Sequence, residues 1–358
     1  MAPLDQIPHR AYLEAIRAEL EVHRPHFAGR RLVSIYFGGG TPSLWPPECL
    51  AGAAAAVCAA FGEGALAEVT IEANPVDCTP DNLAGWRAAG IDRVSIGVQS
   101  VSAGDLVALG RDHRMGEGLA AVEAARTAGF VRMSADIILG APGSRQPLAS
   151  VTELARRAVP HLSVYELTVE EGTPLHQQVA RGEVVPEDED QLADLYVAAH
   201  ELLVASGYQH YEVSSYARPG ARAVHNSLYW RGAEFLGLGA GAASFRRGEG
   251  GGGTRWSNHR SVGRYLAAAP DARSADREEL DARALAADRI WLGLRTADGV
   301  ALDEVPAELL DWLVGPAALA SIEGGRVRPT VRGFLYSNRV LARVVDLCSS
   351  LGSGSSRS

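Results

Sequence analysis

The sequence of 358 residues is 47% hydrophobic and carries a formal net charge of −9. A chain of this size buries a large core, and we expect one large domain and a smaller one. The negative charge argues against nucleic acid as a partner. No apolar run reaches the length of about 18 residues that a membrane helix needs. Because the segment Met1–Pro8 also lacks the apolar core of a signal peptide, we expect a cytoplasmic protein without an integral membrane segment.

Helix-like and strand-like segments then alternate along the chain. An amphipathic helix is predicted over Arg10–Val22. Strands rich in β-branched residues are predicted at Leu32–Phe37, Glu68–Ala73, Arg93–Gln99, Val131–Leu139 and Leu162–Val169. Helices are predicted between and after them, at Pro47–Phe61, Pro80–Ala89, Gly116–Ala128, Pro147–Val159 and Gln191–Ala205. The strands recur about every 25 to 40 residues, the length of a βαβ unit, so we predict an α/β fold with a parallel sheet, open or closed into a barrel.

The first predicted strand runs into the triple-glycine turn Gly38-Gly39-Gly40. Ile35 and Phe37 carry the bulk of a strand, and Pro42 fixes the exit from the turn. Because glycine has no Cβ, a ligand can lie almost against this backbone. The alternative is a tight turn between strand and helix with nothing bound.

Polar side chains mark the next four predicted strands. Glu72 and Gln99 close the second and third strands, Asp136 lies inside the fourth, and Thr168 and Glu170 end the fifth. One such residue usually caps the following helix. Four in succession, beside a glycine turn, favour a shared pocket at the carboxyl ends of the strands.

Several segments match known proteins in order and spacing. Five of them resemble the radical S-adenosylmethionine (SAM) proteins related to oxygen-independent coproporphyrinogen III oxidase: Phe37–Ser43, Ile71–Pro75, Arg93–Ser100, Leu109–His113 and Asp136–Gly140. Three later segments resemble the HemW haem-chaperone branch of that family: Tyr211–Ala217, His225–Trp230 and Leu236–Ala242. The resemblance extends from about Pro8 to Val345. It implies a partial (β/α) barrel followed by a smaller, mainly helical C-terminal domain.

This resemblance implies a domain layout. Residues 1–215 form the barrel, 216–270 a barrel extension, 271–346 a winged-helix-like domain and 347–358 a disordered tail. Within the later parts, Gly248–Gly253 reads as a hairpin tip, and the pattern becomes helical from about Ser261. The segments Gly325–Arg328 and Thr330–Gly333 are expected to bracket a short hairpin before a last helix.

The resemblance also assigns SAM contacts. It places Gly39, Gly40 and Thr41 along the methionine part of SAM. The other implied contacts are side chains that can pair with the carboxylate, the amino group or the ribose hydroxyls, namely Glu72, Gln99, Arg111 and Asp136, with Thr168 near the adenine. Taken alone, Arg111 would read as a surface salt bridge.

The segment His225–Trp230 is a second candidate site. In the HemW branch it is tied to haem binding, which implies that His225, Tyr229 and Trp230 contact haem. A neutral imidazole is a good haem-iron ligand, and aromatic faces pack against a macrocycle. The alternative is that Tyr229 and Trp230 anchor a core and His225 is a turn residue.

In this family a CxxxCxxC motif holds a [4Fe–4S] cluster, and the resemblance places that motif upstream of Pro8. Cys49, Cys58, Cys78 and Cys348 do not have that spacing, so we expect no cluster ligands and no first barrel strand in this sequence. A smaller departure is Ala243, where the family often has His. Three explanations stay open: a misplaced start, a paralogue that lost the cluster, or a damaged fragment.

The function implied is a haem chaperone that binds haem and delivers it to an acceptor protein, with respiratory proteins among the candidate acceptors. One alternative is an oxygen-independent coproporphyrinogen III oxidase-like enzyme of porphyrin biosynthesis. Another is an inactive paralogue, or a barrel that binds SAM or a nucleotide without radical chemistry. Because radical chemistry needs the cluster, the sequence leaves open whether the protein is an enzyme.

Overall fold

The computed structural model describes residues 8–350 and contains a seven-stranded sheet in the order β1-β2-β3-β4-β5-β7-β6. The first five strands are parallel and follow the chain order: β1 (Ser34–Phe37), β2 (Glu68–Ala73), β3 (Arg93–Gln99), β4 (Arg132–Leu139) and β5 (His161–Glu166). The predicted α/β fold with a parallel sheet is therefore confirmed. Two antiparallel strands that the sequence did not predict, β7 (Ser215–Ala217) and β6 (Gln209–Glu212), extend the sheet beyond β5.

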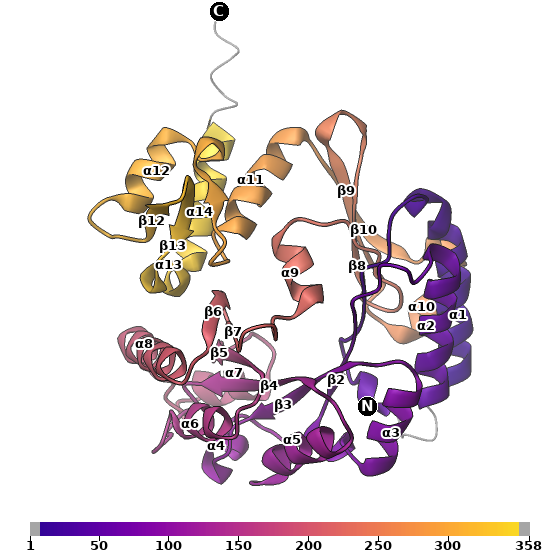
Figure 1. The fold of residues 1–358 in the computed structure, drawn as a ribbon, viewed down its shortest axis with the longest axis horizontal. Helices are drawn as coiled ribbons and strands as arrows, with labels where there is room; N and C mark the ends of the chain where they lie inside the picture. Colours follow the sequence, from indigo (N-terminus) through magenta and orange to yellow (C-terminus); the bar gives the residue numbers. More distant parts are fainter. Residues whose placement is uncertain (1–7, 351–358) are drawn as a thin grey trace, which may run out of the picture.

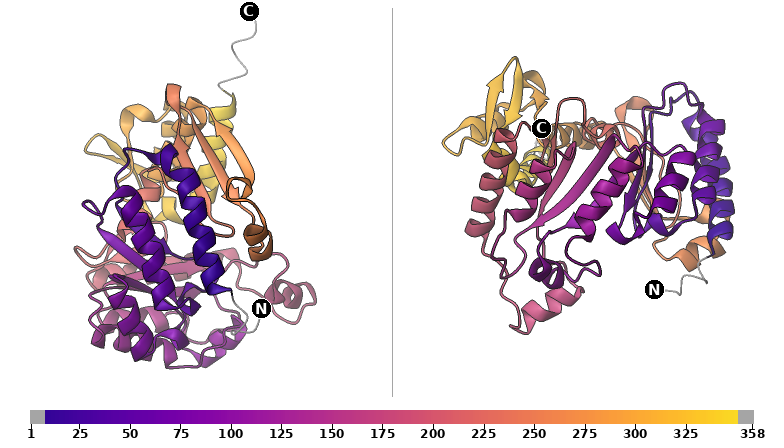
Figure 2. Two further views of the ribbon diagram at one scale, coloured as in Figure 1. Left: turned by 90° about the vertical axis from the view of Figure 1, so that its right-hand side faces the viewer. Right: turned by 60° about the horizontal axis from the view of Figure 1, so that its bottom comes forward.

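Helices cover the outer face of this curved sheet, as Figures 1 and 2 show. They are α2 (Pro47–Phe61), α3 (Pro80–Ala88), α5 (Glu117–Thr127), α6 (Ala149–Arg156) and α8 (Glu189–Ala205). Apolar side chains between these helices and the sheet, among them Trp86, Ile96, Val122 and Ile137, are almost fully buried and form the main core. The inner face carries polar side chains such as Glu68 and Arg93. The helix α9 (Val224–Trp230) lies over this face.

A second sheet packs beside the N-terminal helix α1 (His9–His23). Its strands are antiparallel, in the order β10 (Ser274–Leu280), β9 (Gly253–Asn258) and β8 (Ala243–Arg247). The carboxylate of Glu19, buried in α1, ties the helix to this unit: it accepts hydrogen bonds from the hydroxyl of Tyr265 at 2.6 Å and from the backbone N–H of Gly239 at 3.0 Å. Tyr265 belongs to α10 (Val262–Ala267).

The predicted hairpin tip at Gly248–Gly253 is confirmed, since this segment joins β8 to β9. The helical prediction after Ser261 is wrong for residues 274–280, which form β10. The exposed, charged side chains of β10 give no strand pattern, and its pairing with β9 fixes the conformation instead. The fifth barrel strand ends at Glu166 rather than at Val169, so Thr168 lies in the following loop. The predicted domain limits stay a prediction. The expected limit at residue 270 separates β9 from β10, although these two strands pair with each other.

The C-terminal unit has its own core, which includes Leu309, Leu313, Val327 and Val344. Its helices are α11 (Ala282–Gly293), α12 (Ala307–Val314), α13 (Val331–Leu335) and α14 (Ser337–Ser350), and its strands are β11 (Val300–Ala301), β12 (Ala320–Glu323) and β13 (Arg326–Pro329). The predicted hairpin is shifted: β12 and β13 flank the turn at Gly324-Gly325, and Thr330 instead caps α13. The helix α14 continues to residue 350, into the range assigned to a tail, and residues 351–358 lie outside the described residues.

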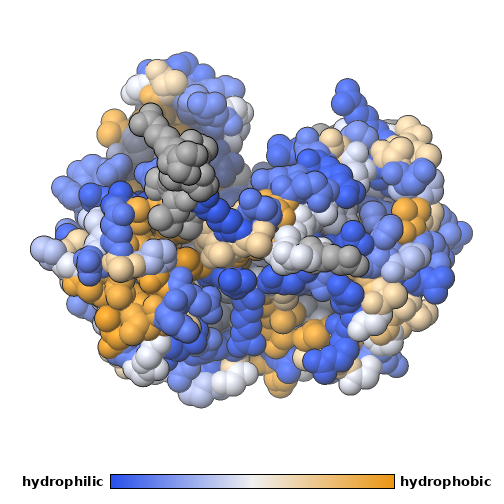
Figure 3. Space-filling model, turned by 90° about the horizontal axis from the view of Figure 1, so that it is seen from above, coloured by the Kyte–Doolittle hydropathy of each residue, from blue (hydrophilic) through white to orange (hydrophobic). Residues whose placement is uncertain are grey.

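The surface seen from above is mostly hydrophilic, and its outline is notched between two lobes (Figure 3). Within residues 8–350, no helix combines the length and the apolar character that crossing a membrane requires. Two remaining short helices are α4 (Ala103–Ala108) and α7 (Pro174–Ala180).

Candidate functional site

A cavity of about 780 Å³ lies at the carboxyl ends of the parallel strands. Every residue with an implied SAM contact except Gly39 lines it: Gly40, Thr41, Glu72, Gln99, Arg111, Asp136 and Thr168. Gly39 is directly adjacent, because its backbone N–H donates to the Glu72 carboxylate at 3.2 Å. The structure therefore brings the eight residues together, while their contact with SAM stays a prediction.

The strand register explains the convergence. Side chains alternate between the two faces of a strand, so every second residue faces the inside of the sheet. Glu72 of β2 pairs with Ser95 of β3, and Asp136 of β4 pairs with Ser163 of β5. The hydroxyl of Ser95 donates to both carboxylate oxygens of Asp136, at 3.1 and 3.3 Å. These neighbouring strands thus build one polar layer beneath the cavity.

Asp136 is the most perturbed carboxyl group in this layer. Burial raises the pKa of Asp136 to about 6, although hydrogen bonds from Ser163 and Ser95 lower it in part and the charge of Glu72 raises it. A carboxyl group with such a pKa changes its charge near neutral pH and can exchange a proton or a hydrogen bond with a ligand.

Glu72 is held from two sides. Its carboxylate accepts a hydrogen bond from the hydroxyl of Tyr36 at 2.6 Å as well as the one from Gly39. Gly39 and Gly40 have φ angles of 75° and 63°, a conformation that favours glycine, so the turn needs glycine at both positions. The turn therefore presents backbone, rather than side chains, to this end of the cavity.

Gln99 lines the cavity at a point where the strand β3 is irregular. Its φ angle is 62°, which is strained for a residue other than glycine, and the β3–β4 register shifts between Ile96 and Gln99. A Cβ at Gly97 would lie 2.9 Å from the side-chain nitrogen of Gln99, so glycine leaves room for that amide. Such bulges often re-aim a side chain beside a functional site.

Arg111 and Thr168 come from loops after α4 and β5, and both are exposed. Arg111 forms no ion pair with any side chain that the structure describes, so the structure does not support its interpretation as a surface salt bridge. Instead, its guanidinium group is available at the edge of the cavity, where it could pair with an anionic group.

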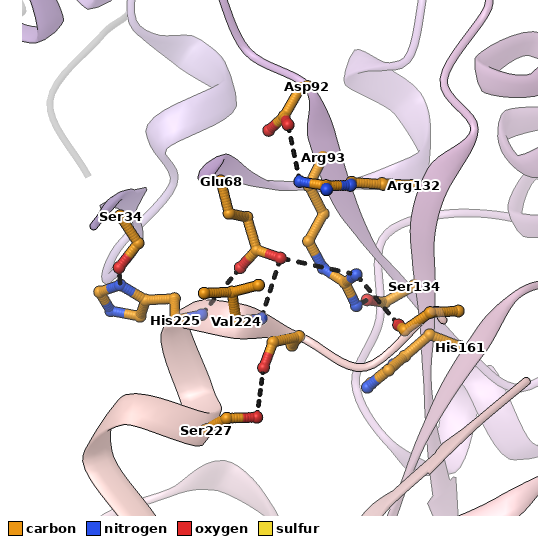
Figure 4. A network of polar contacts seen from close by, with 12 residues as sticks. Ser34, Glu68, Asp92, Arg93, Arg132, Ser134, His161, Val224, His225 and Ser227 are labelled. Carbon is orange, nitrogen blue, oxygen red and sulfur yellow. Dashed lines mark hydrogen bonds and ion pairs between the residues drawn. The ribbon is translucent and has the colours of Figure 1, made fainter. Parts of the chain in front are cut away.

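The second candidate site is built around α9, which Glu68 anchors from β2 (Figure 4). The Glu68 carboxylate accepts hydrogen bonds from the backbone N–H groups of Val224 at 3.0 Å and His225 at 2.9 Å. These are two of the N–H groups that a helix N-terminus leaves unpaired. Arg93 lies 3.9 Å from the same carboxylate and donates to Ser134 at 2.6 Å, and both charged side chains are almost fully buried.

His225 is thereby placed with both ring nitrogens hydrogen-bonded. Nδ1 lies 2.9 Å from the hydroxyl of Ser34, and Nε2 lies 3.2 Å from the hydroxyl of Tyr229. Burial lowers the pKa of His225 to about 4, against the opposing charge of Glu68. The imidazole is therefore neutral at physiological pH, which is the form that binds a metal ion.

His225 and Tyr229 line a largely apolar cavity of about 620 Å³ together with residues of β1, α1 and α2. Trp230 does not join them. It lines a different cavity of about 250 Å³ that several arginines border, and the guanidinium of Arg295 lies 5.1 Å from its ring centroid. The structure thus brings together two of the three residues with an implied haem contact.

The three cysteines whose side chains the structure describes, Cys49, Cys58 and Cys78, do not form a metal site. Cys49 and Cys58 lie on α2, and Cys78 is buried after β2. Burial raises the pKa of the Cys78 thiol to about 12, so it is not a thiolate. Among the side chains that the structure describes, those of residues 8–248 and 250–347, no group of three His, Cys, Asp or Glu is placed to hold a metal ion. These three cysteines are not brought together and do not fit a [4Fe–4S] cluster.

Sequence reasoning missed several residues of both sites, namely Tyr36, Glu68, Arg93, Ser95 and Ser163. A signal was present: polar residues recur at every second position of the strands, as in Glu68, Thr70 and Glu72. Such a period marks a strand whose inner face is polar.

Comparison with known proteins agrees with this geometry. The chain contains a radical SAM domain, since the sequence profile described as the Radical SAM superfamily matches residues 8–146. The chain is 36% identical to the haem chaperone HemW of Mycobacterium tuberculosis over 346 residues, covering 95% of this chain and 87% of that protein. It is 31% identical to the haem chaperone HemW of Lactococcus lactis over 349 residues, covering 94% and 89%. The chain therefore belongs to the HemW haem-chaperone family.

A solved structure supports the fold. The chain superimposes on the radical SAM enzyme coproporphyrinogen III oxidase (HemN) of Escherichia coli with a TM-score of 0.75, covering 95% of this chain and 84% of that one. The sequence identity is 21%, so this likeness concerns the fold alone.

Proposed function

We propose that this protein is a cytoplasmic haem chaperone that binds haem, delivers it to acceptor proteins and holds SAM in the cavity at the carboxyl ends of the sheet. The observation that carries the proposal is the similarity to HemW proteins along nearly the whole chain, at 36% identity to the one from M. tuberculosis. The geometry of the two sites adds independent support.

The SAM part of the proposal rests on the cavity lined by Glu72 and Asp136. SAM combines an adenosine, a sulfonium centre and an amino-acid end. In the proposal, the backbone of Gly40 and Thr41 borders the amino-acid end, and Arg111 pairs with its carboxylate. Glu72 and Asp136 accept hydrogen bonds from the amino group or the ribose hydroxyls.

The haem part of the proposal rests on His225. The Ser34 hydroxyl beside Nδ1 orients the ring, as the second hydrogen bond of a ligating histidine usually does. Tyr229 would release Nε2 to the iron, and the apolar side chains of the 620 Å³ cavity would contact the macrocycle. Trp230 is assigned no contact with haem in this proposal, because it lines the other cavity.

A transfer experiment tests the function. The protein is loaded with haem, freed of excess haem and mixed with a haem-free respiratory cytochrome b, with apomyoglobin as the passive reference. Delivery through contact predicts a transfer rate to the cytochrome that rises with its concentration. A rate that is independent of acceptor concentration, as expected for passive release, would contradict delivery.

A parallel assay separates the enzyme alternative. Coproporphyrinogen III is incubated with the protein, SAM and a low-potential reductant, and the products are separated by chromatography. The proposal expects no decarboxylated product, whereas its accumulation would favour the oxidase.

A further inference from the structure

Tyr36 stands between the two candidate sites. It lies in the middle of β1, where it lines the apolar cavity that also contains His225. Its hydroxyl reaches Glu72, which lines the other cavity. One side chain therefore contacts a central residue of each site.

Both contacts are close. The Tyr36 hydroxyl donates to Glu72 at 2.6 Å, and the Tyr36 ring stacks on the His225 imidazole with centroids 4.7 Å apart and planes at 20°. Burial and the neighbouring Glu72 raise the pKa of Tyr36 far above its ordinary value, so the hydroxyl keeps its proton. It therefore acts as a hydrogen-bond donor to the carboxylate.

The first glycine of the triple-glycine turn makes room for this arrangement. A Cβ at Gly38 would clash with the ring carbons of Tyr36 and would lie 3.1 Å from the carboxyl carbon of Glu72. Unlike Gly39 and Gly40, Gly38 does not have a left-handed conformation, so space rather than backbone geometry calls for glycine here.

We propose that Tyr36 is a positioning residue that couples the two cavities, so that a ligand in one raises the affinity of the other. This proposal rests on the proposed function, because it takes the two ligands to be SAM and haem. The contacts that carry it are those of Tyr36 with Glu72 and His225.

The coupling arises because each of the two ligands orders the side chain of Tyr36. A ligand held by Glu72 restrains the Tyr36 hydroxyl and thereby its ring, and a ligand held by His225 restrains the imidazole and thereby the same ring. The second ligand then meets a side chain that is already ordered and loses less conformational entropy on binding. By thermodynamic linkage, the effect must be equal in both directions.

The test measures the affinity of S-adenosylhomocysteine, which cannot undergo radical cleavage, by calorimetry with haem-free and haem-loaded protein. We expect binding to be about fivefold tighter in the haem-loaded protein, and an equal gain for haem in the reciprocal titration. The readout is the ratio of the S-adenosylhomocysteine affinity of the haem-loaded protein to that of the haem-free protein. In Tyr36→Phe, which keeps the ring and removes the hydroxyl, this ratio should fall to about 1, whatever the individual affinities become. The exposed Tyr336→Phe is the matched control and should keep the wild-type ratio.

A wild-type ratio of about 1 with both ligands bound would overturn the coupling and leave the proposed function intact. A fivefold ratio retained in Tyr36→Phe would overturn the role of Tyr36. A second readout needs no haem: S-adenosylhomocysteine should shift the NMR signals of the His225 ring in the wild type but not in Tyr36→Phe. If haem fails to bind while this shift is seen, the proposed function fails, but the link from Glu72 through Tyr36 to His225 stands. An unmoved His225 signal, or no S-adenosylhomocysteine binding, would overturn the coupling.

Discussion

The two candidate sites are built in different ways. The residues of the cavity at the carboxyl ends of the sheet come from five successive strands and the loops that follow them, so its lining is spread along a shared edge. The His225 site rests on one short helix, and that helix is held by Glu68, which lies 156 residues before Val224. Substituting one residue of the first site should therefore weaken ligand binding only in part. Removing Glu68 should disrupt the second site as a whole.

The largest effect is therefore expected for Glu68→Ala. This change removes the partner of the buried Arg93 and leaves the N-terminus of α9 without its acceptor. Loss of one member of a buried ion pair costs about 3–5 kcal/mol, and we expect a fall of that size in the free energy of unfolding, measured by urea denaturation. The exposed Glu63→Ala should change it by less than about 0.5 kcal/mol. A fall below about 1 kcal/mol for Glu68→Ala would show that α9 has another anchor.

The next largest effect is a pH dependence of the free energy of unfolding that arises from Asp136. Because the pKa of Asp136 is about 6 in the folded protein and 3.8 ordinarily, the folded state holds the proton more strongly than the unfolded chain. The stabilisation from this proton is complete below the ordinary value and is lost as the pH rises through about 6. The free energy of unfolding of the wild type, minus that of Asp136→Asn, should thus fall by up to about 3 kcal/mol from pH 4 to pH 7.5.

The subtraction matters because the pKa values of His161 and His225 are lowered by burial, which makes stability fall with decreasing pH in both proteins. Their contribution cancels in the difference. A difference that is flat across this pH range would contradict the raised pKa of Asp136.

A smaller effect is expected for Arg111→Ala. An exposed guanidinium that pairs with a carboxylate contributes about 1 kcal/mol, so S-adenosylhomocysteine should bind about fivefold more weakly. Adenosine lacks that carboxylate, and its affinity should not change in the same variant. Arg114→Ala, a change in the same exposed loop, is the matched control. Equal losses for both ligands would place Arg111 at the nucleoside instead.

Glu72, Gln99 and Asp136 could be predicted as one site from the sequence because parallel strands end at a common edge. Each lies at or near the end of a strand whose apolar pattern is clear, so the chain order alone brings them together. The apolar pattern also placed the first five strands and the longer helices between them to within a few residues, but it missed the short helix α4.

Glu68 and β10 show what the sequence could not predict. Glu68 looks like the polar first residue of a strand, and nothing local indicates that it caps a helix far along the chain. The charged residues of β10 become a strand only because β9 offers its edge. Contacts of this kind depend on the assembled fold, as does the left-handed backbone of Gln99.

The most direct test of the central claim is a spectroscopic haem titration of the wild type and His225→Ala, with the exposed His26→Ala as control. We expect a saturable Soret shift for the wild type and His26→Ala, and an affinity at least about tenfold weaker for His225→Ala, since an axial ligand is lost. Wild-type affinity in His225→Ala, or no haem binding by the wild type, would contradict the account.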